Sequence, residues 1–319
     1  MPRNLEKLGL PEGLVADADV RVAGAVAFTE GPAVDADGNV FFSDIVNNRI
    51  MKRAADGSLS VWRADSGRAN GNMFDAEGRL VTCEGAEFGA GGRRRITRTD
   101  MRTGAVEILT ERYEGKRYNS PNDLVIDKQS RIYFTDPRYK DDRSDLELDV
   151  EAVYRLDPDG HVTRVLSQPA IQKPNGITIS PDNRTLYLVD SSPTPGGNRK
   201  IWAFDLSPRG VPSGQRLVYD FAPGRGGDGM RTDIQGNLWI AAGIRRPRHA
   251  NETGEFPTGI YVVTPDGKML GRIPVPEDVI TNLAFGGTDL KTLYIVAGKS
   301  LFSIRVNVAG HVVYPGAAQ

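Results

Sequence analysis

The sequence predicts an all-β protein: a six-bladed β-propeller with four-stranded blades around a central channel, formed by residues 1–319 as a single domain. A unit of polar residue, turn and short apolar strand occurs six times, and the polar residues lie 40, 52, 53, 53 and 54 positions apart. This period, with Gly or Asn turns between alternating apolar runs, is typical of a radially repeated β-architecture. The six polar residues are Glu30, Asn70, Asn122, Asn175, Asp228 and Asn282.

Each repeat contains an inner hairpin followed by a pair of outer strands. The inner hairpins contain, in chain order, VDADGNVFFSD, FDAEGRLVTCE, IDKQSRIYFTD, ISPDNRTLYLVD, TDIQGNLWIAA and FGGTDLKTLYIVA. Outer pairs such as NRIMKRAADGSLSVWR and EAVYRLDPDGHVTRVL turn at Asp-Gly, where Gly supplies the positive φ that a tight hairpin needs. The last blade lacks one strand before the chain ends. We expect the N-terminal run from Asp19 to Phe28 to fill that place.

Composition excludes several classes of partner. A net charge of −1 gives no electrostatic footprint for nucleic acid or an anionic membrane, so small-molecule partners are favoured. No run approaches the roughly 18 apolar residues of a membrane span, and the N-terminus lacks the apolar stretch of a signal peptide. We therefore expect a cytoplasmic protein that is a monomer or a weak homo-oligomer. The single cysteine, Cys83, lies in the strand LVTCE and is expected to be a buried apolar residue.

Three segments interrupt the repeat. The Gly-rich segment 85–95 lacks the Gly-Lys-Ser/Thr of a phosphate loop, so we interpret it as a plain connection. Segment 137–150 is a charged insertion, and segment 244–258 separates the inner and outer strands of the fifth blade. We expect both insertions at the end of the propeller where loops reach the mouth of the channel, with 244–258, Arg138 and Tyr139 overhanging the site there. The alternative is that both are surface loops without a role. The arginines of segment 244–258, Arg245, Arg246 and Arg248, could attract an acidic substrate.

The six polar residues carry the predicted chemistry. Radial symmetry should bring two carboxylates and four amides to one end of the channel. Oxygen donors of this kind suit hard cations, and Ca²⁺ in particular, whereas the three histidines stand at no equivalent position and give no zinc site. The alternative is that these Asn and Asp residues only cap hairpins through local hydrogen bonds. Their occurrence in register favours the site.

Several strings resemble the gluconolactonase/regucalcin (senescence marker protein) family of six-bladed propellers, which is related to diisopropyl-fluorophosphatase and a staphylococcal drug-responsive lactonase. They are TEGP, FSDIVNNRI, SPNDLVID with YFTDP, KPNGITISPD with TLYLVD, and GDGMRTDIQGNLW. The resemblance spans roughly residues 25 to 305. It implies that Glu30, Asn175 and Asp228 bind one divalent metal, that Asn122 completes the metal shell or contacts substrate, and that Asp228 is also the general base. Regucalcin-like members carry an Arg where this chain has Ser120.

The function we expect is metal-dependent hydrolysis of the lactone ring of a small, sugar-derived substrate. The ion is expected to be Ca²⁺ in the resting protein, with Mg²⁺, Mn²⁺ or Zn²⁺ as alternatives. Asn122, Asn70, Asn282 and Arg138 are the predicted substrate contacts. No Gly-x-Ser-x-Gly elbow indicates a serine hydrolase. The alternatives are a phosphotriesterase-like or other ester hydrolase on the same metal site, and a non-catalytic ligand-binding propeller.

Overall fold

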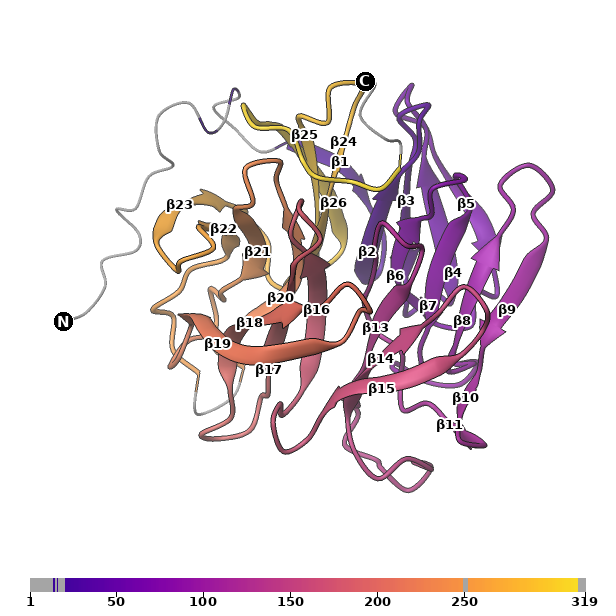
Figure 1. Ribbon diagram of the computed structural model, residues 1–319. Helices are drawn as coiled ribbons and strands as arrows, with labels where there is room; N and C mark the ends of the chain where they lie inside the picture. Colours follow the sequence, from indigo (N-terminus) through magenta and orange to yellow (C-terminus); the bar gives the residue numbers. More distant parts are fainter. Residues whose placement is uncertain (1–13, 15, 17–20, 249–251, 315–319) are drawn as a thin grey trace.

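The computed structural model describes residues 14, 16, 21–248 and 252–314, and within them every regular element is a β-strand. Six four-stranded antiparallel sheets surround a central channel, so the predicted six-bladed propeller is confirmed (Figure 1). Among the described residues, no helix has the length and apolar character needed to cross a membrane.

The first three blades follow the chain without crossovers, each built from the channel outward. Blade one contains β2 (Thr29–Val34), β3 (Val40–Asp44), β4 (Arg49–Arg53) and β5 (Leu59–Ala64). Blade two contains β6 (Ala69–Phe74), β7 (Leu80–Glu84), β8 (Arg95–Thr99) and β9 (Val106–Thr110). Blade three contains β12 (Leu124–Ile126), β13 (Ile132–Asp136), β14 (Ala152–Leu156) and β15 (Val162–Ser167), and a small hairpin, β10 (Arg112–Tyr113) with β11 (Lys116–Arg117), precedes it.

The other three blades repeat this plan. Blade four contains β16 (Pro174–Ile179), β17 (Thr185–Ser191), β18 (Arg199–Leu206) and β19 (Pro212–Asp220). Blade five contains β20 (Gly227–Thr232), β21 (Leu238–Ala242), β22 (Gly259–Val263) and β23 (Met269–Pro274). Blade six contains β24 (Ile280–Gly286), β25 (Thr292–Ala297) and β26 (Ser300–Arg305), with β1 (Arg21–Ala25) as its outermost strand.

Strand β1 closes the ring, as the strand count predicted. It pairs antiparallel with β26, so that Arg21 stands opposite Ser303 and Ala25 opposite Ser300. Residues 19 and 20 of the expected run lie outside the described residues. Because the first strand of the chain completes the last blade, the two ends of the fold hold each other in place.

Local hydrogen bonds explain why the inner hairpins turn where they do. In four blades an aspartate stands just before the turn, and its Oδ1 accepts hydrogen bonds from the amides two and four positions later. The four are Asp35, Asp75, Asp127 and Asp233. Such a carboxylate satisfies amides that the ladder cannot reach, which fixes the register of the two strands on either side.

The apolar core lies between neighbouring blades. Between blades four and five, for example, Val189 and Ile201 pack in one buried cluster with Met230, Ile240 and Tyr261. Similar clusters join the other blades. Each blade buries both faces against its neighbours, so the innermost strands are held rigidly around the channel.

The innermost strands share a feature that positions the predicted site residues. Their pairing shifts by a β-bulge in blades one, two, four, five and six, at or beside Glu30, Asn70, Asn175, Asp228 and Asn282. A bulge adds one unpaired residue and re-aims its side chain. The backbones also approach closely here: a Cβ on Gly31 would lie 2.1 Å from the carbonyl oxygen of Asn70 in the next blade. Glycine at this position therefore allows neighbouring blades to meet at the channel.

Candidate active site

A cavity of about 560 Å³ opens at one end of the channel. Five of the six repeated polar residues line it: Glu30, Asn70, Asn122, Asn175 and Asp228. The repeat thus brings two carboxylates and three amides into one pocket. All five side chains belong to residues that are at most 8% exposed.

Glu30 is a carboxylate with little compensation for its burial. Its Oε2 accepts a hydrogen bond of 2.9 Å from the amide of Gly31 and one of 3.4 Å from Nδ2 of Asn282. Burial, and then the charge of Asp228, raise the pKa of the Glu30 carboxyl well above its usual range. An added cation would favour the ionised form, because it would offset both effects.

Asp228 is held by an ion pair with a neighbouring arginine. Nη2 of Arg225 donates to its Oδ2 at 2.5 Å, and the amide of Asn175 also favours the ionised carboxylate. Burial raises the pKa of the Asp228 carboxyl, although Arg225 and Asn175 act in the opposite direction. Arg225 is itself fixed, since Nη1 donates to the carbonyl of Ile280 at 2.9 Å. A buried carboxyl with a raised pKa is a stronger base than an exposed one.

Two of the amides have an oxygen atom that accepts no hydrogen bond from a described residue. Nδ2 of Asn175 donates to the hydroxyl of Tyr139 at 2.8 Å, and that hydroxyl donates to the carbonyl of Ser191 at 3.5 Å. Because the amide nitrogen faces Tyr139, Oδ1 of Asn175 remains available to a ligand. Oδ1 of Asn70 is buried and accepts no hydrogen bond. Unpaired oxygens of this kind suit a cation or a polar substrate.

These donors fit a hard divalent ion. Nowhere in the described part of the chain do three His, Cys, Asp or Glu side chains gather as a metal site, so an ion here would need amide oxygens as well as carboxylates. Glu30, Asp228 and Asn175 supply such a mixed oxygen set, with Asn122 beside them. Ca²⁺ takes carboxylate and amide oxygens together, and the set contains no nitrogen or sulfur ligand.

Two predicted substrate contacts lie outside the cavity wall. Asn282 is buried beneath it and directs Nδ2 toward both Glu30 and Asp123, at 3.4 Å each. Arg138 is 1% exposed, and its Nη2 donates to Oδ1 of Asp145 at 2.5 Å within the same insertion. In this structure each side chain contacts protein groups, and their predicted contact with substrate stays a prediction.

The interpretation of segment 85–95 as a plain connection is wrong, because Glu87, Phe88 and Gly89 line the cavity. Oγ of Ser120 accepts a hydrogen bond from the amide of Ala86 at 2.9 Å, and Oε1 of Glu87 accepts one from the amide of Tyr139 at 3.1 Å. The direction of the strands in each blade could have predicted that this segment reaches the cavity. The polar residues begin the first strand of each blade, so every connection after a second strand emerges at the same end of the channel.

Segment 244–258 also reaches the cavity, as far as it is described. Arg248 and Glu252 line it, and residues 249–251 lie outside the described residues. Arg245 is not among the residues that line the cavity, and its Nη1 donates to the carbonyl of Pro276 at 2.7 Å. Further cavity residues were not predicted from the sequence. They include Phe28, Arg199 and Arg225, whereas Lys140 and Asp141 belong to the insertion 137–150, which was expected near the channel mouth.

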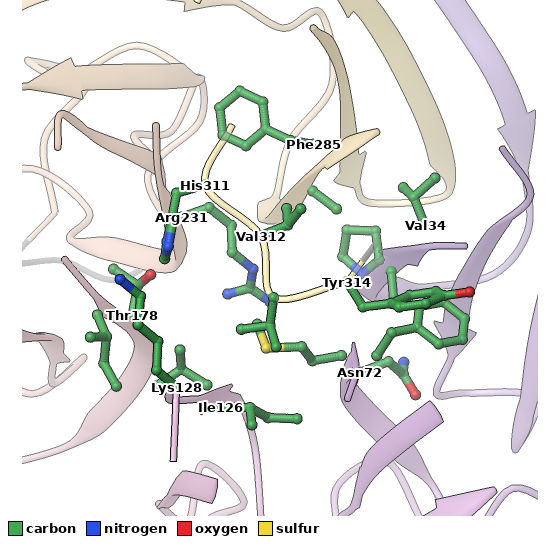
Figure 2. A pocket seen from close by; sticks show the side chains of 18 of the residues that line it. Val34, Asn72, Ile126, Lys128, Thr178, Arg231, Phe285, His311, Val312 and Tyr314 are labelled. Carbon is green, nitrogen blue, oxygen red and sulfur yellow. The ribbon is translucent and has the colours of Figure 1, made fainter. Parts of the chain in front are cut away.

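A second, smaller cavity of about 230 Å³ occupies the other end of the channel. Figure 2 shows Arg231 in the middle of the view, with His311, Val312 and Tyr314 of the C-terminal segment near it. The guanidinium of Arg231 pairs with Asp123 at 3.1 Å, and both residues are buried. This ion pair lies in the channel and helps to separate the two cavities.

The fold and the site together define a six-bladed propeller with a buried, oxygen-rich polar cluster at one mouth of its channel. Comparison with known proteins identifies the family: the sequence matches the SMP-30/Gluconolactonase/LRE-like region over residues 28–299, and the chain belongs to this family.

Individual relatives agree with this assignment. The chain is 31% identical to a gluconolactonase of Zymomonas mobilis over 91% of this chain and 81% of that protein. It is 29% identical to a 6-deoxy-6-sulfogluconolactonase of Pseudomonas putida over 64% of this chain and 68% of that protein. Among solved structures, a gluconolactonase of Xanthomonas campestris superposes with a TM-score of 0.78 and 32% identity, covering 94% of this chain and 93% of that one.

Proposed function

We propose that this protein is a divalent-metal-dependent lactonase that opens the ring of a sugar-derived lactone. One observation carries the proposal: two buried carboxylates, Glu30 and Asp228, converge with the amide of Asn175 in a cavity of about 560 Å³. A cavity of this size accommodates a small ring. The names of the gluconolactonase relatives support the same reaction class.

The residues present would hold the ion through Glu30, Asn175 and Asp228, with Asn122 as a fourth ligand or a neighbour. Bound there, a divalent cation supplies Lewis-acid polarisation of the lactone carbonyl and stabilises the negative charge that develops on its oxygen. The donor set favours Ca²⁺ in the resting protein, and Mg²⁺, Mn²⁺ or Zn²⁺ are alternatives for catalysis.

The chain itself performs the proton transfer and the positioning. Asp228 accepts the proton of the water that attacks the carbonyl carbon. The ester bond between that carbon and the ring oxygen then breaks, and the leaving oxygen takes up the proton that Asp228 holds. Arg225 holds the Asp228 carboxylate in one orientation, which keeps the base aligned with the water. Asn70 lines the cavity and is the proposed contact for a substrate hydroxyl.

A substrate panel tests the proposal. Five- and six-membered sugar lactones, aryl esters and phosphotriesters would be assayed with metal, with chelator, and with metal restored. We expect hydrolysis of sugar lactones that chelation abolishes and metal restores. Full activity after chelation, with no metal found by elemental analysis, would contradict metal dependence. Faster hydrolysis of phosphotriesters than of any lactone would assign the site to that reaction.

A further inference from the structure

The cavity wall formed by blades four and five carries an arginine that lacks an anionic partner. Arg199 is the first residue of β18 and is 5% exposed. Its guanidinium forms no ion pair with any described residue, and its one side-chain hydrogen bond to the described part of the chain runs from Nη1 to the carbonyl of Asn198 at 3.2 Å. Most buried charges in proteins are paired, because taking an unpaired charge out of water is costly.

The free donors of Arg199 are open to the cavity. A guanidinium has five N–H donors, and the bond to Asn198 uses one. Buried, unpaired nitrogens occur elsewhere in the described chain, for instance on Arg53 and Arg272, but those of Arg199 are not among them. The unpaired nitrogens of Arg199 therefore keep accessible surface, and the residue lines the cavity.

The surroundings hold this side chain in place without neutralising it. The stem packs against Gly226, where an added Cβ would lie 3.0 Å from Cδ of Arg199. Glu252 is the carboxylate with the greatest electrostatic influence on the guanidinium, yet it forms no ion pair with it, and its Oε2 accepts a hydrogen bond from the backbone amide of Arg248. Arg225 is nearby, but its charge is already compensated by Asp228.

We propose that Arg199 forms a subsite for an anionic group on the substrate, separate from the ring carbonyl. Resting on the proposed lactonase function, this assigns the substrate class as lactones of sugars that bear a carboxylate, phosphate or sulfonate. Arginine is suited to this task because its planar fork binds such groups through two parallel hydrogen bonds. Tyr139 lies within electrostatic range of Arg199 and hydrogen-bonds to Asn175, so the subsite adjoins the cluster that receives the ring.

Matched substrates and variants test the subsite. D-Glucono-1,5-lactone would be compared with its 6-phosphate and 6-sulfonate analogues, using the wild type, Arg199→Gln and the control Arg246→Gln. Arg246 is an exposed arginine of the neighbouring loop that does not line the cavity. For Arg199→Gln we expect kcat/KM to fall roughly 10- to 100-fold on the anionic lactones, the range for a lost hydrogen-bonded charge, and to change less than about threefold on the neutral lactone. The control should match the wild type.

A binding measurement separates this proposal from the proposed function. Calorimetry would compare gluconate with 6-phosphogluconate, which differ only in the second anionic group. We expect Arg199→Gln to weaken 6-phosphogluconate selectively. Equal weakening of both acids would assign Arg199 to the carboxylate of the ring-opened product, and no weakening of either would also overturn the subsite. Selective weakening without hydrolysis of any lactone would leave the subsite standing and refute the lactonase.

Discussion

Replacing Asp228 with Asn separates two roles that the structure gives to this carboxylate. The amide keeps an oxygen for a metal ion but cannot accept a proton. If Asp228 is the general base, we expect kcat to stay roughly 10²- to 10⁴-fold low even at saturating metal, the usual range for loss of general-base catalysis. If Asp228 only holds the ion, activity should return as the metal concentration rises.

The structure also predicts a cost in stability. Arg225 and Asp228 form a mostly buried pair at 2.5 Å, with each side chain 11% exposed. Asp228→Asn leaves the guanidinium charge without its partner, and breaking a buried pair in this way costs about 3–5 kcal/mol. The neutral amide can still accept one hydrogen bond from Arg225, so we expect the free energy of unfolding to fall by about 3 kcal/mol, as measured by urea unfolding.

A double variant separates the two effects. Arg225→Gln in the Asp228→Asn background removes the unpaired charge, so it should recover part of the stability while leaving kcat low. The assay is kcat on a sugar lactone, with metal occupancy determined by elemental analysis in each variant. A near-normal kcat in metal-loaded Asp228→Asn would refute the reasoning and move the base to Glu30 or to another group in the cavity.

Three further outcomes are expected. Gly31→Ala should destabilise the fold by more than about 2 kcal/mol in urea unfolding, because the added Cβ would meet a backbone oxygen. Gly104 is also at positive φ but faces open space, so Gly104→Ala should cost less. Equal losses in the two variants would disprove the close approach at Gly31. Tyr139→Phe should weaken metal binding roughly tenfold by releasing Asn175, with kcat restored at saturating metal; an unchanged metal titration would deny Tyr139 this role. Burial, and then the charge of Lys128, lower the pKa of His311 in the folded protein. The contribution of neutral His311 to the free energy of unfolding should therefore be complete above the unfolded pKa of about 6.5 and be lost as the pH falls toward the folded pKa. Thermal unfolding of His311→Gln should not show this loss.

The sequence predicted the parts of the molecule that repeat. The spacing of the polar residues reported the blade number, and the strand deficit of the last blade predicted that the N-terminal segment would complete it. Glu30, Asn70, Asn122, Asn175 and Asp228 reach one cavity because radial symmetry places equivalent positions at one end of a channel.

What does not repeat could not be placed in this way. Asn282 has the same position in its repeat, but its amide hydrogen-bonds to Glu30 and Asp123 below the cavity, and a partner distant in sequence leaves no local signal. Arg138 binds Asp145 within its own insertion, which a list of charges does not reveal. Glu87 follows the second strand of blade two and Arg199 begins the third strand of blade four, and the loops at these places differ in length and sequence from blade to blade.

The buried ion pair between Arg231 and Asp123 affects how substrate enters the channel and how product leaves it. Asn282 donates to the same aspartate, and all three residues are buried, so we expect that a sugar-sized molecule does not pass from one end of the channel to the other. Substrate entry and product release would then both use the end of the channel where Glu87, Tyr139 and Arg248 line the cavity. The ring-opened acid therefore blocks the next substrate until it leaves. Product release can then become the step that limits turnover. Sequence changes in the loops around the cavity would alter the rate of that step without disturbing the six blades.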